Sequence, residues 1–289
     1  MSVLISPVEL RDLLAAGDRP RLLDVRWSLA APHGQADYVS GHLPGAVFVD
    51  LENELSLRGA RSEGRHPLPP VEYLESAARR WGIDDEDTVV VYDDAYGLSA
   101  ARAWWLLRHA GIADVRILDG GLAAWRSADG PLEAGTPVVP RGTATLRYGH
   151  LPVLSPDDAA ALPGRGVLVD ARARERYLGE AEPVDPRAGH IPGAVNAPTT
   201  DNLGPDGRFL SPDALRARFA ALGITADAAT PVGVYCGSGV TAAHEIAALT
   251  LAGIDAALYS GSWSQWSSTE GRPVETDENV LPARAVLAP

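Results

Sequence analysis

The fold of this protein is decided by residues 232–244, which read Val232-Gly233-Val234-Tyr235-Cys236-Gly237-Ser238-Gly239-Val240-Thr241-Ala242-Ala243-His244. An apolar run ends at Tyr235, a glycine-rich turn follows, and an alanine-rich run continues to Leu251. This pattern predicts a strand, a tight loop and a helix. The loop begins with Cys236, which is the single cysteine of the chain.

A cysteine at the start of such a loop indicates a nucleophile. Glycines 237 and 239 allow successive backbone N–H groups to point into one concave cup, and the helix adds the positive end of its dipole. These surroundings favour the thiolate form of a cysteine. The alternative is that Cys236 is a small buried hydrophobic residue, the more frequent role of a lone cysteine. The Gly237-Ser238-Gly239 sequence that follows favours the nucleophile.

The chain contains an internal duplication. Four segments recur in the same order: residues 22–26 at 168–172, 41–47 at 189–195, 89–92 at 232–235 and 120–125 at 261–266. A period this long excludes a solenoid and indicates two tandem copies of one domain. We predict a first domain over residues 1–135, a linker over 136–152 and a second, catalytic domain over 153–289.

Each copy alternates short apolar runs with helical stretches. The runs Arg21–Val25, Val89–Tyr92 and Val115–Leu118 are typical of strands buried on both faces of a parallel sheet. Ser-Pro pairs at residues 6–7, 155–156 and 211–212 predict helix starts, each with a serine N-cap and a proline in the first turn. The fold class is therefore α/β, with a mostly parallel sheet and helices on both faces in each domain.

The loop Cys236-Gly237-Ser238-Gly239-Val240-Thr241-Ala242 resembles the active-site loop of the rhodanese superfamily, and within it that of the 3-mercaptopyruvate sulfurtransferases. Thiosulfate-type rhodaneses carry basic residues where this chain has Gly237 and Ser238. The resemblance implies two rhodanese-like domains, an inactive first copy and a site between the domains. It further implies transfer of sulfane sulfur from 3-mercaptopyruvate, through a Cys236 persulfide, to a thiol or cyanide acceptor. It implies no cofactor and no metal.

The resemblance also implies substrate-binding residues. Arg176 and Arg187 stand where the family holds the substrate carboxylate and ketone, and a guanidinium offers a planar fork of donors that matches a carboxylate. The alternative is that both arginines form surface ion pairs with nearby acids. We also expect the loop residues Gly237, Gly239, Val240 and Thr241 to contact the substrate. Ser238 is expected to donate to the sulfur or the carbonyl, and the alternative is that its hydroxyl bonds the loop backbone.

Several other polar residues receive a structural interpretation. We expect Thr241 to cap its helix and His244 to face solvent. His42 and His190 lie in identical motifs of both copies, so a role in the turn is favoured. Where the second copy has Cys236, the first has Asp93, and we interpret Asp93-Asp94 as a solvated turn. The tryptophans 104, 105, 263 and 266 are expected to be core or interface anchors.

The family's proposed relay joins the loop serine to a histidine and an acid of the first domain. His66 resembles that histidine, and Glu52 stands where an aspartate is commoner. The segment 62–65, Ser-Glu-Gly-Arg, departs from the usual Ser-Pro sequence of the family. The alternative is that His66 helps to dock the domains.

Composition narrows the range of partners. The net charge of −13 argues against nucleic acid as a partner, because a phosphate backbone attracts a basic surface. Residues 1–7 lack the pattern of a signal peptide and no apolar run could span a membrane, so we expect a cytoplasmic protein. Family analogy favours a monomer, with a thiol, cyanide or thioredoxin as acceptor.

Three competing functions share this loop. A thiosulfate sulfurtransferase would use the same persulfide, and a non-catalytic binding module would leave Cys236 inert. A cysteine phosphatase needs an arginine that closes the loop on the phosphate, and position 242 is alanine. A sulfurtransferase that uses 3-mercaptopyruvate remains the leading hypothesis.

Overall fold

The computed structural model describes residues 2–30, 33–226 and 230–278 of the chain. The described residues divide into two compact units. The first unit holds the residues up to 59, residues 66–152 and residues 205–209, and the second holds residues 60–65, 153–204 and those from 210 onward. Each unit therefore includes one short segment from the other half of the sequence. The predicted end of the second domain, residue 289, lies outside the described residues.

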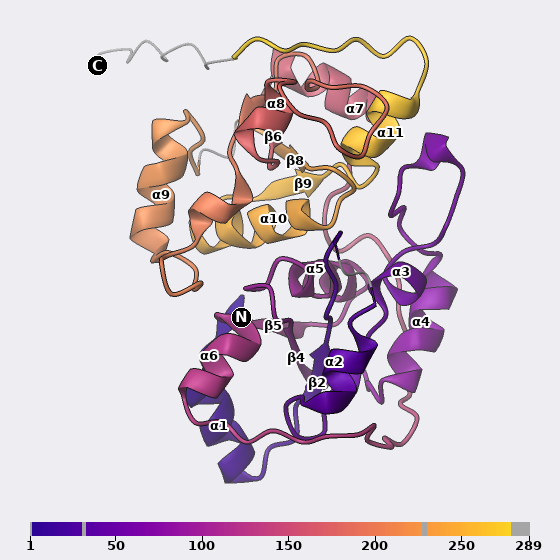
Figure 1. The fold of residues 1–289 in the computed structure, drawn as a ribbon, viewed down its shortest axis with the longest axis vertical. Coiled ribbons are helices and arrows are strands. Elements are labelled where there is room, and N and C mark those ends of the chain that lie inside the picture. Colours follow the sequence, from indigo (N-terminus) through magenta and orange to yellow (C-terminus); the bar gives the residue numbers. More distant parts are fainter. Residues whose placement is uncertain (1, 31–32, 227–229, 279–289) are drawn as a thin grey trace. The chain divides into compact units, whose positions relative to one another are not determined.

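The first unit is a five-stranded parallel sheet flanked by helices (Figure 1). Its strands are β1 (Leu4–Ile5), β2 (Arg21–Asp24), β3 (Val47–Phe48), β4 (Thr88–Tyr92) and β5 (Asp114–Leu118), in the order β1-β5-β4-β2-β3. Its helices are α1 (Pro7–Ala16), α2 (Gln35–Ser40), α3 (Leu51–Glu54), α4 (Val71–Arg80), α5 (Ala100–His109) and α6 (Gly121–Ser127).

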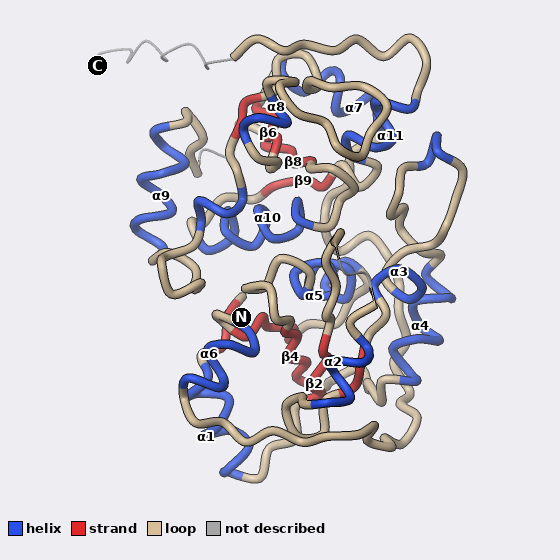
Figure 2. The backbone as a smooth tube through the Cα atoms, viewed as in Figure 1, coloured by secondary structure: helices blue, strands red, loops and turns tan. Residues whose placement is uncertain are grey.

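The second unit is a four-stranded parallel sheet with its own helices, drawn in red and blue in Figure 2. Its strands are β6 (Val167–Asp170), β7 (Val195–Asn196), β8 (Val232–Tyr235) and β9 (Ala256–Leu258), in the order β7-β6-β8-β9. Its α-helices are α7 (Pro156–Ala161), α8 (Arg174–Tyr177), α9 (Pro212–Ala221), α10 (Thr241–Leu251) and α11 (Ser262–Ser268). Its short 3₁₀ helices are η1 (Arg61–Glu63), η2 (Leu162–Gly164) and η3 (Thr199–Asn202).

The two sheets repeat one topology. Leu23 pairs with Val91 in the first, and Val169 pairs with Val234 in the second. Where β1 pairs with β5 in the first unit, the second has a single parallel bridge from Val153 to Leu258. The duplication predicted from the sequence and the α/β fold class are both confirmed.

Local signals account for the helix starts. Ser6, Ser155 and Ser211 each accept a hydrogen bond from the backbone N–H three residues on, with proline next in the chain. Hydrophobic burial then fixes the helices on the sheets. In the first unit Tyr92, Trp125 and Leu10 belong to one buried cluster, and in the second Tyr235 and Trp263 belong to another. Among the described helices, none is long and apolar enough to cross a membrane.

Residues 136–152, predicted as a linker, contain no helix or strand and pack along the first unit. The Gly142 and Arg147 N–H groups donate to the carbonyls of Arg79 and Ala110 at 2.8 and 2.9 Å. The Tyr148 hydroxyl donates to the Pro69 carbonyl at 2.8 Å. Hydrogen bonds therefore fix the path of this segment.

Candidate active site

The loop after β8 has the strand–loop–helix form that the sequence predicts. β8 ends at Tyr235, Cys236 follows directly, and α10 begins at Thr241. The start of α11 holds the loop from one side. Trp263 N–H donates to the Cys236 carbonyl and Ser264 N–H to the Gly237 carbonyl, both at 2.9 Å, and Cys236 N–H donates to Ser262 Oγ at 3.1 Å. The cysteine is thus fixed by the fold on its backbone side.

The sulfur of Cys236 receives a backbone hydrogen bond. Gly239 N–H lies 3.1 Å from Cys236 Sγ, and the thiol is free and buried. Gly239 has φ +80°, and a Cβ there would stand 2.4 Å from the Ser260 carbonyl oxygen, so only glycine fits. Together with the N-terminus of the eleven-residue α10, this N–H stabilises negative charge on the sulfur.

The first copy shows what such a cup binds when no cysteine is present. The carboxylate of Asp93 is fully buried and accepts four backbone N–H groups at 2.8–2.9 Å, those of Ala95, Gly97, Ser99 and Ala100. The prediction that Asp93 lies in a solvated turn is wrong, while Asp94 is exposed. Burial raises the pKa of Asp93, and the four N–H groups act in the opposite direction. The loop architecture of this fold therefore accommodates an anionic side chain.

Two arginines lie against the cysteine loop. A Cβ on Gly237 would stand 3.1 Å from Arg65 Nη2 and 3.4 Å from Arg176 Nη1. Arg176, at the end of α8, donates to Glu182 Oε1 at 2.7 Å and to Asp185 Oδ2 at 3.3 Å. Arg65 is ion-paired with the other oxygen of Asp185. Both guanidinium groups are therefore held side by side above Gly237.

The side chains of the two acids between these arginines, Glu182 and Asp185, are each only 4% exposed. Glu182 also accepts the N–H groups of Val184 and Asp185, which shapes the loop that carries Asp185. Burial raises the pKa of Asp185, although Arg65 and Arg176 act against that rise. The charges of the two arginines are thus largely balanced by protein carboxylates.

Arg187 does not share this position. Its guanidinium donates to four backbone carbonyls at 2.7–3.1 Å, those of Trp266, Ser267, Thr269 and Arg272. Its own carbonyl accepts the indole N–H of Trp263 at 2.9 Å. The structure therefore directs Arg187 to the C-terminal end of α11, where it satisfies carbonyls that a helix end leaves open.

Arg65 is the residue that sequence reasoning missed as a partner of the loop. The departure of residues 62–65 from the family pattern was the available signal, since it introduces a cation next to His66. Nothing local in the sequence places residue 65 beside residue 237. In the structure, Arg65 N–H donates to Ser264 Oγ at 3.1 Å, and Gln265 Nε2 donates to the Ser62 carbonyl at 3.0 Å.

The remaining loop residues lie at the start of α10. Ser238 and Val240 are buried, and Thr241 is half-buried. The predicted cap role of Thr241 is wrong, because Val240 occupies the N-cap position and makes no side-chain cap hydrogen bond.

His244 is buried rather than exposed, so the prediction that it faces solvent is also wrong. Its Nδ1 lies 2.8 Å from Thr199 Oγ1, and α10 is buried at every position from 242 to 249. A helix covered on all sides leaves no solvent-facing position for a side chain near its start.

His66 and Glu52 come together within the first unit. His66 Nε2 lies 3.6 Å from Glu52 Oε1, which also accepts the indole N–H of Trp27 at 3.1 Å. His66 is buried with its ring edge-to-face against Trp27. The pairing of the two groups agrees with the predicted relay, whose operation stays a prediction.

His42, His190 and the four tryptophans named from the sequence have the structural roles that were expected. His42 Nδ1 lies 2.9 Å from the Tyr38 carbonyl, His190 Nδ1 lies 2.8 Å from the Tyr177 carbonyl, and each ring stacks on that tyrosine. Both histidines are fully buried, and the four tryptophans Trp104, Trp105, Trp263 and Trp266 are buried as well.

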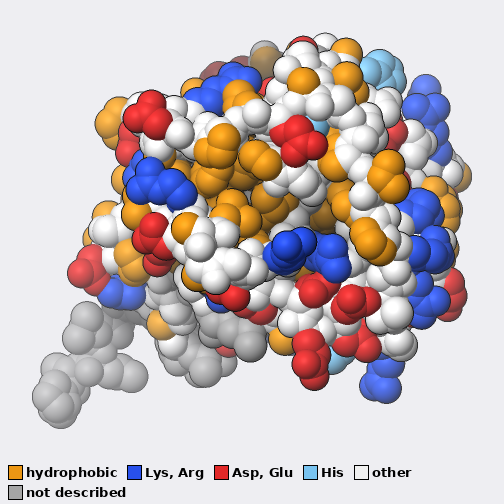
Figure 3. All heavy atoms as spheres, turned by 90° about the horizontal axis from the view of Figure 1, so that it is seen from below, with side chains coloured by type: hydrophobic (Ala, Val, Ile, Leu, Met, Phe, Trp, Pro, Cys, Tyr) orange, Lys and Arg blue, Asp and Glu red, His pale blue; other side chains and the backbone are white. Residues whose placement is uncertain are grey.

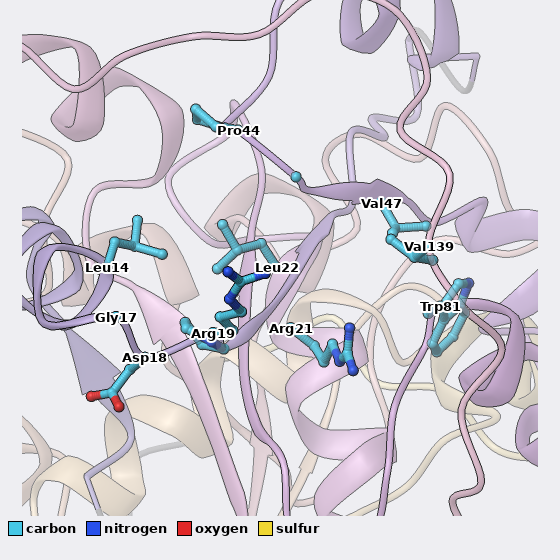
Figure 4. A pocket seen from close by; sticks show the side chains of 12 residues that line it. Leu14, Gly17, Asp18, Arg19, Arg21, Leu22, Pro44, Val47, Trp81 and Val139 are labelled. Carbon is cyan, nitrogen blue, oxygen red and sulfur yellow. The ribbon is translucent and has the colours of Figure 1, made fainter.

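A pocket in the first unit, which no residue of the cysteine loop lines, lacks a nucleophilic thiol or hydroxyl. It measures about 370 Å³ and lies between the end of α1 and the start of β2 (Figure 4). Asp18, Arg19, Arg21 and Trp81 line it together with glycine, proline and aliphatic residues, without cysteine, serine or histidine. Figure 3 shows hydrophobic side chains gathered in a hollow of one face, with acidic and basic side chains around it.

Over the residues that the structure describes, no cluster of acids, histidines or cysteine could hold a metal ion.

Comparison with known proteins agrees with this geometry. The family model for the rhodanese-like domain matches residues 6–128 and again residues 155–269. A Mycobacterium tuberculosis protein provisionally named as the thiosulfate sulfurtransferase SseB is 51% identical over 277 residues, which cover 94% of this chain and 96% of that protein. A Pseudomonas aeruginosa protein provisionally named as a 3-mercaptopyruvate sulfurtransferase is 46% identical over 272 residues, covering 89% and 92%.

A solved structure agrees as well. The crystal structure of the 3-mercaptopyruvate sulfurtransferase SseA from Escherichia coli superimposes with a TM-score of 0.77 at 34% identity, covering 91% of this chain and 99% of that one. Two matches to one domain model, and relatives aligned over nearly their full length, leave a single assignment. The chain belongs to the rhodanese family and carries two tandem rhodanese-like domains.

Proposed function

We propose that this protein is a sulfurtransferase that moves sulfane sulfur from 3-mercaptopyruvate to a thiol or cyanide acceptor through a persulfide on Cys236. The observation that carries the proposal is the pairing of a buried, N–H-bonded sulfur with two guanidinium groups at the same loop. The named relatives are sulfurtransferases, which supports the reaction class.

The first half-reaction follows from these groups. The Cys236 thiolate attacks the sulfur of 3-mercaptopyruvate and forms an S–S bond, while the C–S bond breaks. The bonding pair remains on carbon as the enolate of pyruvate, which takes up a proton to become pyruvate. Negative charge develops on the ketone oxygen, and guanidinium donors aimed at that oxygen lower the barrier. The persulfide left on Cys236 lies in a loop whose counterpart in the first copy surrounds the carboxylate of Asp93 with backbone N–H groups.

The second half-reaction returns the enzyme to its starting state. The acceptor thiolate or cyanide attacks the outer sulfur of the persulfide, the S–S bond breaks, and the electron pair returns to Cys236 Sγ. Two successive transfers through one covalent intermediate predict ping-pong kinetics. Candidate acceptors are a small thiol, cyanide and thioredoxin. We place the protein in the cytoplasm as a monomer, where a reducing environment maintains the working thiol.

The donor is chosen on charge. Thiosulfate is a compact dianion, whereas 3-mercaptopyruvate carries one carboxylate at the end remote from its sulfur. The residues after Cys236 are neutral, and the nearby arginines are already paired with Asp185 and Glu182. A site with balanced charge and directed donor forks fits a carboxylate and a ketone better than a dianion. One relative is named for thiosulfate and another for 3-mercaptopyruvate, so the two donors have to be compared on this protein itself.

Two measurements test the proposal. Protein incubated with 3-mercaptopyruvate should gain the mass of one sulfur atom on the peptide that contains Cys236, and the Cys236→Ser variant should not. In a side-by-side assay with one acceptor, kcat/KM for 3-mercaptopyruvate should exceed that for thiosulfate by at least about 10-fold, or about 1.4 kcal/mol. Equal or higher efficiency with thiosulfate would reject 3-mercaptopyruvate as the preferred donor, without contradicting the persulfide on Cys236. Turnover by folded Cys236→Ser protein would reject the persulfide.

A further inference from the structure

We propose that Arg65 is the second arginine of the donor site, and that it binds the substrate carboxylate jointly with Arg176. The inference deepens the proposed function and rests on it, since it assumes a donor with a carboxylate. It assigns a specificity role to residue 65, in a segment where the sequence suggested only a departure from the family pattern, and it transfers to Arg65 the role first expected of Arg187.

The first argument is position. Arg65 Nη2 and Arg176 Nη1 lie within 3.1 and 3.4 Å of the point where a Gly237 side chain would begin, next to Cys236 in the chain. Of the two arginines expected from the sequence, only Arg176 lies there. The guanidinium of Arg187 donates to four carbonyls at the end of α11.

The second argument is unused donor capacity. The Nε atoms of Arg65 and Arg176 are both buried, and neither has an acceptor among the residues that the structure describes. A buried N–H of a charged group without an acceptor is costly, so such groups are normally paired. Both guanidinium groups lie at Gly237, next to the nucleophile in the chain, and their unused donors indicate a ligand with acceptor oxygens. A carboxylate and an adjacent ketone supply that chemistry.

The third argument is preorganisation. An alternating row of charges runs from Arg172 through Glu182, Arg176 and Asp185 to Arg65. Asp185 contacts one arginine with each oxygen and so fixes the spacing between the two guanidinium groups. The side chains of Arg65 and Arg176 remain 27% and 18% exposed, which leaves them accessible to a small substrate. Preformed orientation reduces the entropy lost when the donor binds.

The fourth argument explains why residue 65 stands there. Gly64 has φ +89°, and a Cβ on it would lie 2.8 Å from the Gly261 carbonyl oxygen. The segment 60–65 can therefore approach the start of α11 closely only because residue 64 is glycine. The Arg65 N–H, bonded to Ser264 Oγ, then sets the direction of its side chain.

The test compares Arg65→Gln with Arg176→Gln and with Arg61→Gln as a matched control. Arg61 lies in the same segment but is exposed. Each variant is assayed with 3-mercaptopyruvate, with thiosulfate and with pyruvate as an inhibitor. Pyruvate carries the carboxylate and ketone without sulfur, so its inhibition constant reports binding separately from chemistry. Thermal unfolding of each variant checks the fold.

We expect Arg65→Gln to raise the KM for 3-mercaptopyruvate and the inhibition constant of pyruvate by at least about 10-fold, because the variant loses a charge-assisted hydrogen bond to the carboxylate. The efficiency with thiosulfate should change less, Arg61→Gln should match the wild type, and Arg65→Lys should fall between because it keeps charge without the fork.

Two outcomes would overturn the inference alone. In the first, Arg176→Gln is impaired with 3-mercaptopyruvate while Arg65→Gln behaves like Arg61→Gln. In the second, Arg65→Gln loses efficiency equally with both donors, which would indicate that Arg65 only positions its segment. A wild-type enzyme that accepts thiosulfate but not 3-mercaptopyruvate would instead overturn the proposed donor, and this inference with it.

Discussion

Replacing Glu245 by glutamine should make the second unit more stable at neutral and alkaline pH. Glu245 lies on α10, the helix that begins at the cysteine loop, and its side chain is fully buried. Asn202 Nδ2 donates to its Oε2 at 2.6 Å, and Arg218 Nη1 lies 3.8 Å from its Oε1. Glutamine has the same shape and keeps a carbonyl oxygen for Asn202, so the substitution mainly removes the buried charge.

The magnitude follows from the pKa of this carboxyl. Burial raises the pKa of Glu245 from 4.5 to about 7, although Arg218 and Asn202 act against the rise. A raised pKa means that the folded state holds a proton that the unfolded state has lost between these two values. The free energy of unfolding therefore falls as pH rises from about 4.5 to about 7, and is constant above that. The total loss is about 3 kcal/mol at about 1.4 kcal/mol per pH unit.

Amide hydrogen exchange in α10 measures this effect in the intact chain. The slowest amides of residues 241–251 report the opening free energy of the structure around them. Glu245→Gln and wild type should show equal protection near about pH 4, below both pKa values, while the variant should be more stable by up to about 3 kcal/mol near about pH 8. Comparing the two proteins at each pH cancels the intrinsic pH dependence of exchange.

Glu180→Gln serves as the matched control, because Glu180 belongs to the same unit but is exposed. It should leave the protection of α10 unchanged at every pH. A difference in stability between Glu245→Gln and wild type that stays constant from low to high pH would refute the reasoning. It would mean that ionisation of Glu245 does not change the free energy of unfolding. A variant that is less stable at alkaline pH would show that the ion pair with Arg218 outweighs burial.

Two further substitutions test the loop and its support. Gly239→Ala should lower the free energy of unfolding by about 3 kcal/mol or more and abolish transfer, because it combines left-handed strain with overlap on the Ser260 carbonyl. Gly253→Ala, with φ +79° and open space around it, should cost only about 1–2 kcal/mol by the same denaturant titration. Arg187→Gln should lower stability by about 3 kcal/mol through lost hydrogen bonds to carbonyls. Arg174→Gln, whose ion pair is exposed, should leave the free energy of unfolding nearly unchanged; an equal loss in both arginine variants would contradict the buried role of Arg187.

The sequence by itself determined the features that depend on neighbours in the chain. The strand–loop–helix around Cys236 and the three serine-capped helices are each encoded within a few residues of one another, and the duplication is visible because such short segments recur in the same order. Backbone conformation and burial along one element follow from side chains that are close in the chain, so patterns of apolar, glycine and proline residues predict them. The recurrence of His42 and His190 in the same motif likewise predicted a shared structural role, although the backbone of each pairs with a distant residue, Glu133 or Glu275.

Only the tertiary structure decided which side chains gather at the cysteine. Arg65 and Arg176 lie far apart in the sequence, yet both reach Gly237, while Arg187 turns to the end of α11. Asp93 and His244 were expected to be exposed because each is polar and lies near a turn or helix start, but packing from other elements buries both. Burial and side-chain direction are set by contacts between distant segments, and no local pattern records those contacts.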